Sequence, residues 1–379
     1  MVRMSENKIL KHNEGHKQQR VDTKFLLITL VLLSLGTIMV CSASFPYASS
    51  HYGDGYYYIK RQFIFLVIGL TAMFLATLLP TELYKKSTPV FYFVCCGLLV
   101  LVLFGGFSEG VAKRWLGIPG TPLSFQPSEL MKLGIILMLS WWSERKNEGK
   151  GILKEIVVPG LILFCPCALV LLEKHLSGTL ILAFIGICIL FISGTSIKKM
   201  LACYGLTGVL GAGAFLLTND YAMKRIESFL NPNADVLSDK WQTTQGLYAI
   251  GSGGIWGLGI GNSLQKYSYV SEPQNDFIFT IWCEETGFFG AVILIVLFIL
   301  LILRGYKIAL KTDNLFASLV AFGITSQIGI QALLNMLVVS DLIPNTGISL
   351  PFFSYGGSSL VILMFEVGIL LSISRKARI

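Results

Sequence analysis

The stretch TGFFGAVILIVLFILLIL, residues 286–303, carries no charged side chain over 18 positions. At about 1.5 Å per residue, a helix of this length nearly crosses the hydrocarbon core of a bilayer, which is about 30 Å thick. The residues at its start, SEPQNDFIFTIWCEETG (271–287), contain four carboxylates, which are Glu272, Asp276, Glu284 and Glu285. The sequence therefore predicts a membrane-spanning helix with acidic side chains gathered at one end.

Similar apolar runs recur along the whole chain. Of its 379 residues, 54% are hydrophobic and only 14% are charged, whereas soluble domains carry about 25% charge. We predict an all-α membrane protein with ten transmembrane helices, at 24–45, 62–79, 88–107, 126–143, 153–172, 177–195, 198–218, 276–303, 315–340 and 353–374. The first run is longer than the apolar part of a signal peptide, so we expect it to remain as a helix.

The distribution of lysine and arginine predicts the orientation of these helices. Most of the 30 basic residues lie in segments on the same side as the N-terminus, and cytoplasmic segments of membrane proteins are enriched in positive charge. Both termini are therefore predicted to be cytoplasmic, with a flexible tail at 1–23, a transmembrane domain at 24–374 and a basic end at 375–379. The net charge of +8 is explained in this way, and no nucleic-acid partner is expected.

One long extracytoplasmic loop, 219–275, is predicted between the seventh and eighth helices. Within it, YAMKRIESFLNP (221–232) has the pattern of a short amphipathic helix. The following segment, QGLYAIGSGGIWGLGIGNS (245–263), contains seven glycines but no phosphate-binding pattern. Two interpretations stay open for it: close approach of its backbone to a neighbour or ligand, or a tight turn at the lipid interface.

The cysteines and histidines indicate no metal site. All eight cysteines lie in apolar runs without a CxxC pair, and the four histidines are scattered through tails and loops. Buried packing thiols are the better interpretation.

The acidic cluster can be placed on a helical projection. If 276–303 is one helix, Asp276 lies at the level of the outer headgroups, and Glu284 is rotated about 80° from it. Asp276 and Glu284 are then expected to share a cavity, while Glu285 faces a neighbouring helix. Ionisable groups at membrane depth usually serve a site or pair with a partner. Glu272, nearer the loop, is interpreted as a solvated carboxylate.

Two other predicted helices carry polar side chains on one face. In QPSELMKLG (126–134), the i, i+3 spacing of Glu129 and Lys132 predicts an ion pair. In 315–340, Gln327, Gln331 and Asn335 recur every four residues, which is typical of hydrogen bonding between helices. Glu366 is a lone acid in the last predicted helix, and Lys132 is the partner we expect for it.

Three segments together resemble one family of membrane proteins. They are KRWLGIPGTPLSFQPSELMKLG (113–134), GLYAIGSGGIWGLGIGNSLQKYSYVSEPQNDFIF (246–279) and IPNTGISLPFFSYGGSSL (343–360). The resemblance is to the SEDS family (shape, elongation, division and sporulation), and within it to the FtsW and SpoVE branch rather than to RodA. It extends through nearly all ten predicted helices in order.

This resemblance implies a peptidoglycan glycosyltransferase of the cell membrane that polymerises lipid II into glycan strands during cell division or sporulation. The implied partners are a class B penicillin-binding protein and other division or sporulation membrane proteins. The essential aspartate of the family corresponds to Asp276, and its arginine before tryptophan corresponds to Arg114. The acid and the lysine of its fourth helix correspond to Glu129 and Lys132.

The chain departs from the family pattern around its motif aspartate, without changing the aspartate itself. Where the family often reads L-P-E-x-x-T-D-F-I-F-A, this chain has Val270, Ser271, Asn275 and Thr280, and Thr286 follows the paired glutamates.

The implied reaction suits the predicted position of the acids. An inverting glycosyl transfer needs a base that deprotonates the acceptor hydroxyl, so we expect Asp276 to be that base or a ligand of a divalent cation such as Mg²⁺ or Mn²⁺. No organic cofactor is expected. Arg114 and Lys266 are candidates for phosphate contact, and Glu284 for a supporting role.

Two other classes of function stay open. One is a flippase for the same lipid, which is expected to carry its charged site near the middle of the membrane. The other is a scaffold of the division machinery, which needs no buried charge. The clustering of acids at the outer rim favours catalysis on the extracytoplasmic side.

Overall fold

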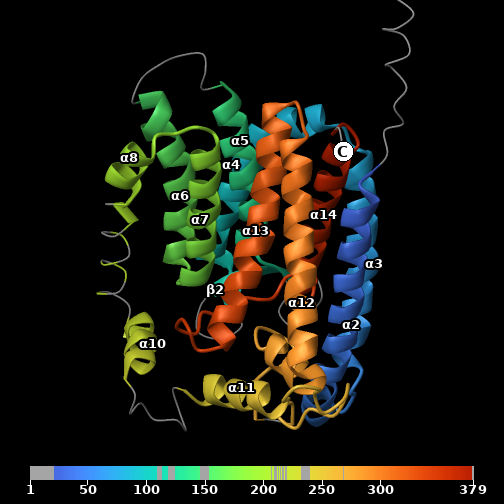
Figure 1. Ribbon diagram of the computed structural model, residues 1–379. Helices are drawn as coiled ribbons and strands as arrows, with labels where there is room; N and C mark the ends of the chain where they lie inside the picture. The colour runs from blue at the N-terminus through green and yellow to red at the C-terminus, as the bar shows by residue number, and fades with distance from the viewer. Residues whose placement is uncertain are drawn as a thin grey trace, which may run out of the picture.

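The computed structural model describes residues 21–108, 113–117, 124–145, 153–205, 220–231, 240–267 and 269–377, and single positions between 207 and 217. Long helices stand side by side in a bundle (Figure 1). The described helices are α2 (Thr23–Tyr52), α3 (Tyr57–Leu78), α4 (Thr81–Gly105), α5 (Pro127–Arg145), α6 (Val158–Leu172), α7 (Leu176–Ile192), α8 (Ile197–Met200), α10 (Asp220–Leu230), α11 (Trp241–Ser252), α12 (Ile278–Leu310), α13 (Leu315–Val339) and α14 (Gly357–Ser374), with π-helical segments η3 (Leu153–Val157) and η4 (Leu201–Gly205).

The bundle is that of a multi-pass membrane protein. Seven segments of the described chain are long and apolar enough to cross a membrane, and they contain α2, α3, α4, α6, α12, α13 and α14. The apolar α7 is shorter, with 17 residues, and α5 packs among α4, α7 and α13 although it carries charges. The seventh predicted helix, 198–218, falls on α8, η4 and a stretch that lies largely outside the described residues, as does most of the predicted tail 1–23.

The two described ends of the chain meet at one end of the bundle. The backbone N–H of Asp22, just before α2, donates to Ser374 Oγ at the end of α14, over 3.0 Å. The amphipathic α10 and α11 lie at the opposite end (Figure 1). The helix predicted in 221–232 is confirmed as α10, whereas α11 and a small antiparallel sheet were not predicted. That sheet has the order β1 (Phe107–Ser108), β2 (Lys113–Gly117) and β3 (Ser124–Phe125).

The helix predicted at 276–303 begins later and is kinked. It starts at Ile278, and Gly287 interrupts it with φ 68° and ψ −166°. The glycine-rich segment packs backbone to backbone on this kink, since Leu258 N donates to Glu284 O over 3.0 Å and Phe288 N donates to Gly254 O over 2.9 Å. A Cβ at Gly257 would lie 2.3 Å from Glu285 O. Close approach to a neighbouring backbone is therefore the correct interpretation for Gly253 and Gly257, whereas a Cβ at Gly251, Gly254 or Gly261 would meet no described residue within 4 Å.

The last helix also begins later than predicted, at Gly357 instead of residue 353. The preceding segment 341–356 is irregular, and Phe352 and Phe353 within it are buried. Irregular backbone at membrane depth is tolerated where protein groups satisfy its hydrogen bonds. Here Asn335 Nδ2 donates to Ile348 O over 2.6 Å, and Gln331 Nε2 donates to Ser349 O over 3.1 Å. The polar stripe of α13 thus holds the segment that shapes the site.

Candidate functional site

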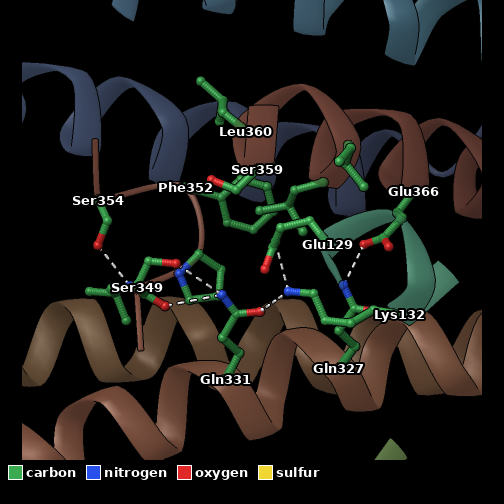
Figure 2. A pocket seen from close by; sticks show the side chains of 14 residues that line it. Glu129, Lys132, Gln327, Gln331, Ser349, Phe352, Ser354, Ser359, Leu360 and Glu366 are labelled. Carbon is green, nitrogen blue, oxygen red and sulfur yellow. Dashed lines mark hydrogen bonds and ion pairs between the residues drawn. The ribbon is translucent and has the colours of Figure 1, made fainter. Parts of the chain in front are cut away.

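A polar cavity of about 150 Å³ lies between α5, α7, α13 and the segment 347–359. Its lining includes charged, amide and hydroxyl side chains with few apolar ones, among them Gln126, Ser128, Glu129, Lys132, His175, Ser177, Gln331 and Tyr355. A smaller pocket of about 20 Å³ shares Glu129, Lys132 and Gln331 and continues to Glu366. Figure 2 shows these side chains converging from α5, α13 and α14.

The ion pair predicted in α5 is present and faces this cavity. Lys132 Nζ lies 2.8 Å from Glu129 Oε2, with the two side chains 4% and 17% exposed. Lys132 Nζ also donates to Gln331 Oε1 over 3.0 Å, so α5 and α13 are joined through it (Figure 2). The Lys132 side chain is therefore buried in a polar pocket and does not extend to the surface.

Glu366 has a different partner from the one we expected. Its Oε2 accepts a hydrogen bond from Gln327 Nε2 over 2.7 Å, and no ion pair joins it to Lys132 among the described residues. Lys132 is already held by Glu129 and Gln331, at 2.8 and 3.0 Å. Both charges nevertheless line the same small pocket.

Asp276 lies at the edge of the cavity, in a turn just before α12. A Cβ on Gly347, which lines the cavity, would be 3.6 Å from Asp276 Oδ2. Asn335 Nδ2 holds the carbonyl of Asp276 over 2.7 Å. The side chain is partly buried, and burial raises the pKa of its carboxyl to about 6, with the nearby charge of Glu272 adding to the rise and Arg225 opposing it.

The expectation that Asp276 and Glu284 share a cavity is wrong. The helical projection does not apply to Asp276, because α12 begins two residues after it. The buried Glu284 carboxylate accepts hydrogen bonds from Ser263 Oγ and from Leu264 N, the latter over 3.0 Å. Glu284 therefore anchors the loop before Asp276. Its neighbour Glu285 faces α2, as predicted, because Ser42 Oγ donates to it over 2.6 Å.

Lys266 belongs to the same internal network as Glu285. It is 3% exposed, and its Nζ lies 2.9 Å from Glu285 Oε1. It also donates to Gly261 O over 2.6 Å and to Ser42 Oγ over 3.1 Å. An ammonium group has three protons, and all three have acceptors here. The structure thus brings Lys266 together with Glu285 and Ser42, and its hydrogen bonds are made within the protein.

Arg114 lies on β2, beside the loop between α6 and α7. Its Nη2 donates to Lys174 O over 2.5 Å. Nearby, His175 lines the cavity, with Gln126 Nε2 3.2 Å from its Nδ1. Burial and the charges of Arg114 and Lys132 lower the pKa of His175 to about 3, which keeps the ring neutral. His175 was not predicted as a site residue, and nothing in its sequence spacing marks it.

Arg225 was also not predicted, although it lies on the amphipathic helix α10. Its Nη1 donates to Asn345 O over 2.8 Å, which brings α10 against the irregular segment. The positive charge is near enough to Asp276 to act on its carboxyl. The signal for it in the sequence was the amphipathic pattern of 221–232, which predicted a docked helix but not its position.

The described residues could hold a divalent cation only together with a phosphate-bearing substrate. Among the described residues, no group of three or more His, Cys, Asp or Glu side chains could bind a metal alone. Mg²⁺ is commonly bound by one or two carboxylates plus substrate phosphates. Asp276, with Glu272 nearby, offers that kind of donor set.

Comparisons of the sequence and of the structure with known proteins point to the same family. A family model described as cell cycle protein FtsW/RodA/SpoVE matches residues 23–379. The chain is 40% identical over 368 residues to stage V sporulation protein E of Bacillus subtilis, covering 96% of this chain and 99% of the relative. It is 36% identical over 365 residues to a probable peptidoglycan glycosyltransferase FtsW of Geobacter metallireducens, covering 95% and 96%.

Solved structures have the same fold. A chain from a structure on the coordination of polymerization and crosslinking by a peptidoglycan synthase complex matches with a TM-score of 0.77 at 27% identity, covering 94% of this chain and 98% of that one. The rod shape determining protein RodA of Thermus thermophilus matches with a TM-score of 0.70, also at 27% identity, covering 95% and 98%.

Proposed function

Because the chain belongs to the FtsW/RodA/SpoVE family of cell cycle proteins, we propose that it is a peptidoglycan glycosyltransferase that polymerises lipid II into glycan strands. The similarity to relatives named peptidoglycan glycosyltransferase over 95% of the chain supports this. The observation that carries the proposal is the partly buried carboxylate of Asp276, with its raised pKa, beside a polar cavity that contains a buried ion pair.

The proposed topology has ten membrane-spanning helices with both termini in the cytoplasm. The meeting of Asp22 and Ser374 at one end of the bundle supports placing both termini on one side. The loop 219–275, with α10 and α11, then lies at the extracytoplasmic face. Asp276 follows this loop directly, so the reaction takes place at the outer face of the cytoplasmic membrane.

Asp276 acts as the general base of an inverting transfer. Its carboxylate accepts the proton of the acceptor sugar hydroxyl while that oxygen attacks the anomeric carbon of the donor and the lipid pyrophosphate leaves. A pKa of about 6 suits this task, because the group is mostly ionised at neutral pH and is a stronger base than an ordinary aspartate.

Positive charges around the cavity stabilise the leaving group. Lys132 lines the cavity. Arg114 acts electrostatically on His175, which also lines it, and Arg225 acts on Asp276 beside it. Cationic side chains stabilise a departing pyrophosphate. In the alternative role, Asp276 would instead hold a divalent cation, Mg²⁺ or Mn²⁺, together with the pyrophosphate, and the cation would supply further charge neutralisation. Lys266 and Glu284 support the loop that leads to Asp276.

The proposed partner is a class B penicillin-binding protein, which crosslinks the strands as they form. The similarity to a chain from a peptidoglycan synthase complex supports this assignment. Lipid II and the growing glycan strand are the ligands of the cavity, within a division or sporulation assembly.

The test is polymerisation of labelled lipid II by the purified chain. Asp276→Asn keeps the shape of the side chain and removes the base, so glycan strands should not form while membrane abundance stays normal. Glu227→Gln, at an exposed carboxylate on α10, is the matched control and should polymerise normally. Strand synthesis by Asp276→Asn at the normal rate would refute the assignment. Absence of polymerisation by the unmodified chain, with lipid II translocation in vesicles, would favour a flippase.

A further inference from the structure

Aromatic side chains gather at the turn between α2 and α3. The segment FPYASSHYGDGYYYIKR (45–61) contains five tyrosines and a histidine. Tyr52 and Tyr57 stack with ring centroids 4.0 Å apart and planes 9° apart, and Tyr47 stacks on His51 at 4.1 Å and 20°. We call Tyr47, His51, Tyr52, Tyr57 and Tyr58 the aromatic platform.

The turn between the helices positions these rings before any ligand arrives. Gly53 ends α2 with φ 70°, and Asp54 then accepts a hydrogen bond from Tyr56 N over 3.0 Å and pairs with Lys60 over 2.7 Å. A Cβ on Gly55 would lie 2.6 Å from the ring of Phe45. Glycine at position 55 avoids this clash. Tyr52 and Tyr57, on either side of the turn, stack on each other.

The aromatic platform is continuous with the candidate site. The buried Tyr58 packs edge to face on Tyr355, with centroids 4.9 Å apart and planes at 83°. Tyr355 lines the polar cavity, and its N–H donates to Gln274 O over 2.8 Å, two residues before Asp276. The carboxylate of Glu272 acts electrostatically on Tyr47 and Tyr58. A series of contacts therefore connects the turn containing Asp276, through Tyr355 and Tyr58, to the exposed ring of Tyr52.

Anchoring to the lipid headgroups is the common role of aromatic residues at this depth. Two observations favour a ligand instead. The rings stack on one another and on the cavity lining, although Tyr52 remains 51% exposed. Charged groups also surround them, since Arg61 lies 4.2 Å from the centroid of Tyr57 and the Asp54–Lys60 pair borders the turn. Flat aromatic faces among charged, hydrogen-bonding groups suit a ligand that has both apolar faces and hydrogen-bonding groups.

We propose that the aromatic platform is a sugar-binding subsite that holds the glycan strand beside Asp276. The ligand is a β-linked chain of N-acetylated hexosamines, and this identity rests on the proposed function. The C–H face of a pyranose ring packs on an aromatic face, whose π electrons attract those hydrogens. The hydroxyl and acetamido groups meet Asp54, Lys60 and Glu272. Holding the strand here lets the enzyme add sugars repeatedly without releasing it.

The direct test is binding of tetra-N-acetylchitotetraose to the purified full chain, measured by calorimetry and saturation-transfer NMR. The Asp276→Asn background is used so that catalysis plays no part. Tyr52→Leu removes the flat face but stays apolar, and should weaken binding between about twofold and tenfold. Tyr52→Phe keeps the face and should bind normally. Tyr248→Leu, at a 59% exposed tyrosine of α11, is the matched control.

The outcomes separate this inference from the proposed function. Equal sugar binding by Tyr52→Leu, Tyr248→Leu and the parent, or no binding by the parent, overturns the platform, even if lipid II is polymerised. Loss of binding in Tyr52→Leu alone supports it, even if polymerisation fails. Tyr57→Leu removes the ring on which Tyr52 stacks, and an effect on membrane abundance without a change in binding per folded molecule counts against the inference. In the catalytically active chain, Tyr52→Leu should also shorten the glycan strands while the first transfer continues.

Discussion

Breaking the buried ion pair of α5 should destabilise the protein more than removing it entirely. Lys132→Met leaves Glu129 charged without its partner, and Glu129→Gln leaves the Lys132 ammonium with neutral amide acceptors but no negative charge beside it. Removing one partner of a buried pair costs about 3–5 kcal/mol. We expect the lower end for Lys132→Met, because Glu129 is 17% exposed and faces a polar cavity, and the upper end for Glu129→Gln.

The double variant, Glu129→Gln with Lys132→Met, leaves no isolated charge. Its free energy of unfolding should return to within about 1 kcal/mol of the parent, since replacing both partners of a buried pair is often nearly neutral. The two single losses together exceed the loss in the double variant, so the expected coupling energy of the two positions is at least about 5 kcal/mol. Lipid II polymerisation should stay impaired in the double variant, because the cavity has lost the positive charge of Lys132.

The assay is a double-mutant cycle of unfolding in mixed detergent micelles, with membrane abundance measured in parallel. The matched control is the pair Lys376–Glu82, which has the same 2.8 Å separation but side chains 47% and 69% exposed. Lys376→Met should cost less than about 1 kcal/mol. Additive single effects at Glu129 and Lys132, or single variants as stable as Lys376→Met, would refute the reasoning.

Three more outcomes follow from the site. Burial raises the pKa of Asp276 to about 6, and the general base that we propose acts in its deprotonated form. The polymerisation rate should therefore fall about tenfold per pH unit below pH 6 and level off above it; a flat profile from pH 5 to 8 contradicts this. Gly287→Ala should lower the free energy of unfolding by at least about 2 kcal/mol, because φ is 68° and the new Cβ would lie 2.3 Å from Gly257 N. The control Gly97→Ala, with open space at its Cβ, should leave the free energy of unfolding unchanged in the same assay. Lys266→Met should lower membrane abundance through the isolated Glu285 carboxylate yet leave polymerisation per folded molecule intact; a selective loss of activity would return Lys266 to the substrate.

The sequence alone determined the class of the protein and several of its elements. Length and charge depletion of the apolar runs predict membrane-spanning helices, because lipid offers no hydrogen bonds to a backbone that is not helical. Local spacing predicts the Glu129–Lys132 pair, since side chains three residues apart share a helix face, and the amphipathic helix at 220–230 follows from the same periodicity.

Only the tertiary structure decided which side chains meet. The helical projection failed for Asp276 because α12 begins at Ile278, and a projection assumes an unbroken helix. Gln327 rather than Lys132 contacts Glu366, since partners on different helices depend on packing and not on spacing. His175 and Arg225 reach the site from segments about 100 and 50 residues away from Asp276 in the sequence, and no local pattern carries that information. Local periodicity therefore determines where helices form and which of their faces are apolar. The irregular segments within 253–277 and 341–356 determine which side chains meet at the site, and their backbones are held in place by contacts with other helices, which no local pattern predicts.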